Sequence, residues 1–145
     1  MNRADLAVQC FKGTFNCAQC VFSVFAPKLG LKRRIALKIA TPFGGGMAHM
    51  DEVCGAVTGG LMVIGLKHGM SKEEDLEAKE KAYKLSQEFA SRFKKRNKTI
   101  KCRELIGHDL STPEGYDSAK ENNVFDTQCT KFVRDAVEIL EEFFV

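Results

Sequence analysis

Four cysteines are the residues of this chain whose type and placement could do chemistry. Each falls near the predicted beginning of a different helix: Cys17, Cys54, Cys102 and Cys129. The first turn of a helix offers unpaired backbone N–H groups and the positive end of the helix dipole, and both stabilise a thiolate over a thiol. The thiolate is the form of cysteine that attacks disulfides and binds metals. If helix packing brings these positions together, they form a thiol site.

A bland explanation exists for any one of these cysteines, because cysteine is commonly a small buried apolar residue. Four such placements in separate helices favour chemistry instead. Their charges, gathered at one point, would need a cation or a cluster to balance them. The chain has six cysteines in 145 residues, more than packing suggests and fewer than a secreted disulfide scaffold contains.

Cys17 and Cys20 also form a Cys-x-x-Cys spacing, which places both side chains on one face of a helix. A dithiol or a pair of metal ligands would require this arrangement. The thioredoxin fold needs a βαβ pattern around such a pair, and the sequence shows none. A four-cysteine zinc finger usually has two close pairs, whereas the remaining cysteines of the set are far apart.

Helical spacing dominates the sequence and strand-like alternation is scarce, so the predicted fold is all-α. We expect a compact bundle of about six to seven helices in a single domain, residues 1–145, since 44% hydrophobic residues suffice for one core. The expected helices cover residues 4–12, 16–29, 32–40, 52–67, 71–97, 102–106 and 126–144, with a polar connection over 110–124 that has room for another short helix.

Predicted N-caps stand just before, or three residues before, each cysteine of the set. The pairs of cap and cysteine are Asn16 and Cys17, Asp51 and Cys54, Thr99 and Cys102, and Asp126 and Cys129. Capping boxes are predicted for Asn16 with Gln19 and for Ser71 with Glu74.

Two of the expected helices have a clear apolar stripe, which predicts the face that each one buries. The stripes are Leu76, Tyr83, Leu85, Phe89 and Phe93 on the long helix, and Phe132, Val133, Val137, Leu140 and Phe144 on the last one. Gly59, Gly60 and Gly65 are expected to allow close helix packing. The Gly44–Gly46 run is expected to be a flexible lead into the helix of Cys54.

Several short motifs follow one another along the chain: Asn16-Cys17-Ala18-Gln19, Phe43-Gly44-Gly45-Gly46-Met47, Cys54-Gly55-Ala56-Val57-Thr58-Gly59, Cys102-Arg103-Glu104-Leu105 and Cys129. In these motifs the sequence resembles the C-GCAxxG-C-C family of redox-active proteins over nearly its whole length. Cys17, Cys54, Cys102 and Cys129 match the four family cysteines in order. The resemblance implies redox activity at those four residues, as catalytic, cofactor-binding or metal-binding groups. Cys10 and Cys20 are additional to the family pattern.

Three functions remain open at this point. The four cysteines hold an iron–sulfur cluster for electron transfer, or they carry out cofactor-free thiol–disulfide exchange, or they hold a structural zinc in a binding module without redox chemistry. The chain would accordingly be an oxidoreductase, an electron carrier or neither. A redox protein is the expected partner, and the sequence leaves a homodimer open.

His49 and His108 are outside candidates for a ligand or proton carrier, while His68 is expected to interact with the dipole at a helix end.

Charge and hydropathy argue against other classes. The net charge is +3, and the basic run at residues 94–101 is expected to close a long helix, so we expect no nucleic-acid partner. The weakly polar stretch at 53–66 is too short to cross a membrane, so we expect no membrane insertion. Residues 1–14 lack the apolar region of a signal peptide, and we expect a reducing, cytoplasmic location.

Overall fold

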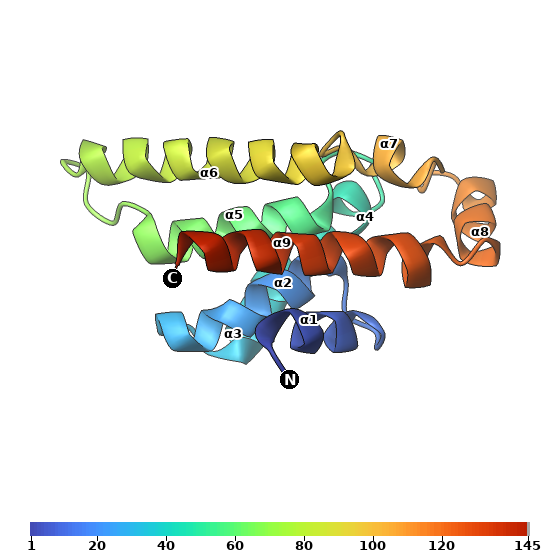
Figure 1. Ribbon diagram of the computed structural model, residues 1–145, viewed down its shortest axis with the longest axis horizontal. Coiled ribbons are helices and arrows are strands. Elements are labelled where there is room, and N and C mark those ends of the chain that lie inside the picture. Colours follow the sequence, from blue (N-terminus) through green and yellow to red (C-terminus); the bar gives the residue numbers. More distant parts are fainter. Residues whose placement is uncertain (145) are drawn as a thin grey trace.

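The computed structural model describes residues 1–144, and within them it contains no strand, so the expected all-α fold is confirmed (Figure 1). Turns of 3₁₀ helix cover Ala26–Leu29 and Thr41–Phe43, and a π-helical turn covers Phe125–Cys129. The α-helices are α1 (Arg3–Phe11), α2 (Cys17–Phe25), α3 (Arg33–Ala40), α4 (Gly44–Met47), α5 (Gly55–His68), α6 (Leu76–Asn97), α7 (Cys102–Ile106), α8 (Pro113–Glu121) and α9 (Thr130–Phe143).

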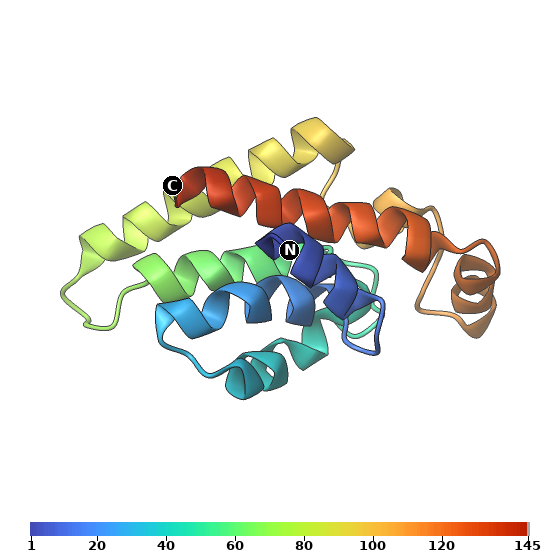
Figure 2. The same ribbon diagram turned by 60° about the horizontal axis from the view of Figure 1, so that its bottom comes forward.

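Helix α2 is the central element of the bundle. Eight of its nine residues are buried, and it packs against α1, α3, α5 and α9. The long helices α6 and α9 pack against each other and against α5; α7 and α8 lie toward one end of the molecule, and α4 contacts α7 (Figures 1 and 2). The beginnings of α2 and α5 point to that same end, so the short helices close the bundle where those helices start.

Glycines let α5 approach α2 closely, as expected for Gly59. A Cβ atom at Gly59 would lie 2.8 Å from the carbonyl oxygen of Ala18, and one at Gly60 would collide with the ring of Phe89. A larger residue at Gly59 would have to move a helix, and one at Gly60 would have to displace the Phe89 ring. The same expectation is wrong for Gly65, where an added Cβ would meet nothing within 4 Å.

The predicted start of the long helix is wrong by several residues. Helix α6 begins at Leu76 with Asp75 as its N-cap, whose side chain accepts from the Ala78 N–H at 3.2 Å, so Ser71 and Glu74 form no capping box there. Its first turns project beyond the end of α9 (Figure 1), which leaves Leu76 62% and Tyr83 54% exposed.

The remaining apolar stripes pack largely as expected. Phe89 and Phe93 of α6 are fully buried, and Leu85 packs against the core from a half-buried position. On the last helix Phe132, Val133, Val137 and Leu140 are buried, and Phe144 is half-buried.

The basic run at the end of α6 serves packing against α9. Arg96 donates to the buried Asp135 at 3.1 Å and to Glu138 at 2.9 Å, and Asn97 donates to the other oxygen of Asp135 at 3.1 Å. This supports a structural role for the cationic helix end. Among residues 1–144, no helix is both long enough and apolar enough to cross a membrane.

Candidate functional site: a four-cysteine cavity

Four free, buried cysteines line one cavity of about 510 Å³: Cys17, Cys54, Cys102 and Cys129. They come from the start of α2, the residue before α5, the start of α7 and the π-helical turn before α9. The structure therefore brings together all four residues that the sequence singled out. We call this space the cysteine cavity.

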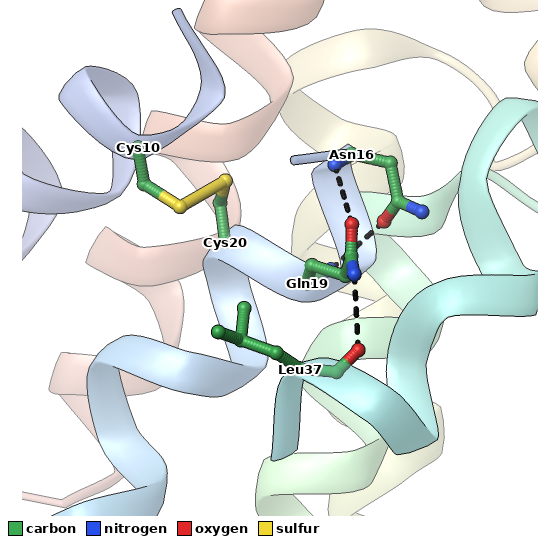
Figure 3. Close-up of a disulfide and its surroundings, with 5 residues drawn as sticks. All are labelled: Cys10, Asn16, Gln19, Cys20 and Leu37. Atoms are coloured by element: carbon green, nitrogen blue, oxygen red, sulfur yellow. Dashed lines mark hydrogen bonds between the residues drawn. A yellow bond between two sulfur atoms is a disulfide. The ribbon is translucent and has the colours of Figure 1, made fainter. Parts of the chain in front are cut away.

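Cys17 is the first residue of α2, and the cap that precedes it is the one predicted. The Asn16 side chain accepts from the Gln19 N–H at 2.9 Å, and the Gln19 side chain accepts from the Asn16 N–H at 2.9 Å (Figure 3). The Gln19 amide also donates to the Leu37 carbonyl at 3.0 Å. These bonds attach the beginning of α2 to α3 and hold Cys17 in place.

Cys54 and Cys102 are positioned by a short antiparallel pairing. The Cys54 N–H donates to the Ile100 carbonyl at 2.8 Å, and the Cys102 N–H donates to the Glu52 carbonyl at 2.7 Å. The two bonds flank the isolated bridge between Val53 and Lys101. This pairing gives two cysteines from distant parts of the chain a common backbone support.

The predicted caps of these two cysteines are wrong. Cys54 is itself the N-cap of α5, and Lys101 is the N-cap of α7, so neither Asp51 nor Thr99 caps a helix. The buried carboxylate of Asp51 instead accepts from Arg103 at 2.9 Å and from the Leu110 N–H at 3.0 Å. Asp51 thus ties α7 and the loop after it to the segment that leads to Cys54.

Cys129 does not lie at a free helix beginning, contrary to expectation. It ends the π-helical turn, with helical backbone angles that continue into α9, and Asp126 forms part of that turn. A π-helical turn inserts an extra residue into a helix and recurs at functional sites. The helix before α9 is therefore irregular at Cys129, the residue that lines the cavity.

A left-handed turn forms another wall of the cavity. Five consecutive residues, Gly45 to His49, have φ between +52° and +66°. A Cβ atom at Gly46 would lie 2.8 Å from the Cys102 Cβ and 2.6 Å from the Glu52 nitrogen. The expected flexible loop is therefore a tightly packed turn, and such rare backbone persists only where surrounding contacts hold it.

Aromatic side chains close the cavity next to this turn. The His49 ring lies 5.2 Å from the Tyr116 ring, and Tyr116 lies 5.5 Å from Phe125; all three line the cavity. His108 and His68 are not among its lining residues, and His68 ends α5 beside Phe144, as expected of a helix-end residue. No sequence pattern singled out Tyr116, which lies in the polar connection, or Phe125, which begins the π-helical turn.

Burial favours the protonated form of three cavity thiols, Cys17, Cys54 and Cys102. It raises the pKa of Cys54 to about 12, although the Ala56 and Val57 N–H groups act in the opposite direction. The Cys129 side chain, within hydrogen-bonding reach, and burial raise the pKa of Cys17 well above its usual range. Burial, and then the charges of Cys54 and Cys129, raise the pKa of Cys102.

The predicted thiolate preference at helix beginnings is thus outweighed by desolvation when the cavity holds no positive group. The N–H groups at the start of α5 act as expected, but water is excluded from the sulfur. Stable thiolates here require a cation or a cationic cluster within the cavity. In residues 1–144, no three His, Cys, Asp or Glu side chains are grouped closely enough to hold a single metal ion.

Cys17 and Cys20 do not form the dithiol or ligand pair that their spacing allowed. Cys20 is joined to Cys10 of α1 by a disulfide, with the two Cα atoms 5.6 Å apart (Figure 3). Cys17 lines the cysteine cavity and Cys20 does not. The two cysteines of α2 therefore belong to different thiol groups.

Neither curated proteins nor solved structures gave a match to this chain, whereas one protein family did. The family described as "Putative redox-active protein (C_GCAxxG_C_C)" matches residues 15–143. The matched segment contains all four cysteines of the cavity. With most of its length matched, the chain belongs to this family of redox-active proteins.

Proposed function

We propose that this chain is an electron-transfer protein whose cavity cysteines, Cys17, Cys54, Cys102 and Cys129, hold an iron–sulfur cluster. The observation that carries the proposal is the convergence of four buried thiols from four separate segments on one cavity. Four cysteine thiolates are the usual ligand set of such clusters. A bound cluster would supply one-electron redox chemistry, and the chain supplies its ligands and surroundings.

The size of the cavity favours a group of several atoms over a single zinc ion. Its volume is about 510 Å³, whereas one water molecule takes up roughly 30 Å³ in the liquid. A structural zinc would need the four sulfurs to close around one centre. Among residues 1–144, no three such side chains are grouped closely enough to hold one ion.

The charges of the site also fit a cationic group. Cys17, Cys54 and Cys102 are buried thiols with raised pKa values, and they lose their protons only when positive charge replaces them, as on metal binding. The Ala56 and Val57 N–H groups then donate to the Cys54 sulfur, and hydrogen bonds of this kind raise the potential of a cluster. Aromatic and glycine residues form part of the wall of the same space.

Thiol–disulfide exchange is the second candidate, and one contact favours it. The Cys17 and Cys129 side chains lie within hydrogen-bonding reach of each other. In this alternative the two thiols would be oxidised to a disulfide while a partner disulfide is reduced to two thiols. Cys54 and Cys102 would then remain reduced beside them.

The deciding experiment is the anaerobic absorption spectrum of the full chain after reconstitution, with iron, sulfide and zinc measured on the same sample. We expect visible bands with iron and sulfide in comparable amounts. A colourless, metal-free protein that loses two thiols at Cys17 and Cys129 on mild oxidation would replace the cluster by thiol–disulfide exchange. Zinc bound to thiols that resist oxidation would establish a structural role.

A further inference from the structure

A second cavity, of about 400 Å³, opens beside the Cys10–Cys20 disulfide. It is lined by Leu6, Gln9, Cys10, Ser23, Val24 and Arg33, none of which lines the cysteine cavity. We call it the disulfide groove. It lies where α1, α2 and the beginning of α3 meet.

The two sulfurs of the disulfide differ in access. Cys10 is half-buried and lines the groove, whereas Cys20 is fully buried and does not line it. Exchange begins with attack by a thiolate on a sulfur that it can reach. The structure therefore selects Cys10 as the attacked sulfur and Cys20 as the leaving group.

Ser23 supplies an unused hydrogen-bond donor at the same place. Its side chain is 2% exposed and lines the groove, and its hydroxyl has no hydrogen-bond partner. Buried hydroxyl groups are nearly always bonded, so an unpartnered one indicates a missing or transient partner. Ser23 lies three residues after Cys20 on α2, a spacing that makes the side chains neighbours, so its hydroxyl can donate to a Cys20 thiolate.

Arg33 gives the groove a positive charge. It is exposed at the first position of α3, and its guanidinium lies 5.5 Å from the centre of the Phe15 ring. Within residues 1–144 it forms no ion pair. A guanidinium binds a carboxylate through two parallel hydrogen bonds.

We infer that the disulfide groove is a thiol-exchange site for a low-molecular-weight thiol that carries a carboxylate. The carboxylate binds Arg33, and the thiolate attacks the Cys10 sulfur. A mixed disulfide forms at Cys10, the Cys10–Cys20 bond breaks, and Cys20 leaves as a thiolate that accepts from Ser23 and then takes up a proton. A second thiol molecule attacks the mixed disulfide and releases Cys10. Two small thiols are thereby oxidised to one disulfide, and the protein disulfide is reduced to two thiols.

The exchange has a structural consequence for the other cavity. Phe11, Thr14, Phe15 and Asn16 line the cysteine cavity and lie inside the ring that the disulfide closes. Reduction removes the covalent link across that wall. The inference goes beyond the proposed electron transfer and does not depend on what the cysteine cavity binds.

The test compares two probe thiols of similar size, 3-mercaptopropionate, which has a carboxylate, and 2-mercaptoethanol, which has none. Trypsin cuts after Lys12 and so separates Cys10, on peptide 4–12, from Cys20, on peptide 13–28. The full chain is quenched with acid at intervals, and mass spectrometry measures the linked peptides and any probe attached to either one.

Arg33→Gln should slow exchange with mercaptopropionate about three- to tenfold relative to mercaptoethanol, because the carboxylate loses its partner. The matched control is Arg34→Gln, which removes an exposed charge next to the groove but not from its lining. Equal effects of the two substitutions on both probes would overturn carboxylate recognition. A first attachment of the probe at Cys20 would overturn the order of attack.

Ser23→Ala separates a chemical role of the hydroxyl from a structural one. Losing an unpartnered buried hydroxyl should leave the melting temperature unchanged or raise it, because no native hydrogen bond is lost. Exchange with both probes should nevertheless slow about threefold or more, since the leaving thiolate loses its donor. An unchanged exchange rate would show that Ser23 takes no part.

Discussion

Cys17 and Cys20 lie three residues apart on α2, yet they belong to two different kinds of thiol group. Cys17 is one of four free thiols contributed by segments from distant parts of the chain, and all of them are buried. Cys20 is bonded to a neighbour on the preceding helix, and that neighbour borders an open groove. The chemistry of a cysteine in this protein is decided by the helices that pack around it and not by its spacing along one helix.

The two groups also differ in what they need in order to react. Burial holds the Cys54 and Cys102 thiols protonated, and they gain their charge only with a positive partner. The disulfide needs no stored charge, because the attacking thiolate arrives from solvent at an accessible sulfur. The two proposals follow this difference: the cavity thiols would retain a bound cofactor, and the disulfide would exchange with a small thiol.

The largest expected effect comes from replacing one cysteine of each thiol group by serine. Cys54→Ser should abolish cluster binding, because it removes one of four ligands at a position with no substitute nearby. Cys20→Ser should leave the iron and sulfide content of the reconstituted protein nearly unchanged. Both variants are compared by absorption and metal analysis, and equal loss of iron in the two would contradict the separation of the groups.

Local signals in the sequence were sufficient for much of the fold. The Asn16–Gln19 capping box was predictable because both of its bonds join residues three apart. Asp51 has the same helix-capping chemistry, but its carboxylate binds Arg103 and the Leu110 N–H, more than 50 residues away. Tertiary contacts of that range leave no local pattern, so the beginning of α5 was placed too early.

The candidate site also has a part that could be predicted from the sequence and a part that could not. Motif order and helix beginnings singled out the four cysteines, which line one cavity; their roles stay a prediction. The left-handed turn was not predictable, since Met47, Ala48 and His49 are residue types that rarely adopt positive φ unless contacts compel them. Cys20 could have paired with Cys17 or Cys10 on spacing alone, and only the position of α1 against α2 decides for Cys10.

The second prediction concerns how the free energy of unfolding depends on pH. The cavity thiols can titrate, whereas the Cys10–Cys20 disulfide cannot. Burial raises the pKa of Cys54 from 9.0 to about 12, so between these values the unfolded chain releases a proton that the folded chain retains. Below pH 9 this difference in pKa costs the folded state nothing. As the pH rises to 12, the free energy of unfolding falls by about 4 kcal/mol because of Cys54.

Urea unfolding of the metal-free protein at several alkaline pH values measures this loss. Cys54→Ser should make the free energy of unfolding fall less steeply with pH, because serine does not ionise in this range. Cys20→Ser should leave the steepness unchanged. A decline of equal steepness in the Cys54→Ser variant would show that other groups account for it.

The third prediction concerns the wall of the cysteine cavity. Gly46→Ala should destabilise the protein by about 2–4 kcal/mol, because its φ is +66° and the new Cβ would collide with the Glu52 nitrogen and the Cys102 side chain. It should also impair cluster reconstitution. Gly65→Ala is the matched control: its site is open and helical, so a gain of about 0.5–1 kcal/mol is expected in thermal unfolding. Similar losses for both glycines would refute a special role of the left-handed turn.

The smallest effect is expected from breaking the disulfide without touching the cavity. Cys10→Ser should lower the free energy of unfolding by about 2–3 kcal/mol, because a ring of residues 10–20 no longer restricts the unfolded chain. Visible absorption after reconstitution should stay close to that of the unmodified chain, since Cys10 is no cavity ligand. Iodoacetamide should label Cys17 faster in this variant, because the wall from Phe11 to Asn16 is no longer tied to α1 through Cys20. Unchanged labelling of Cys17 together with lowered stability would show that the disulfide strengthens the fold without influencing access to the cavity.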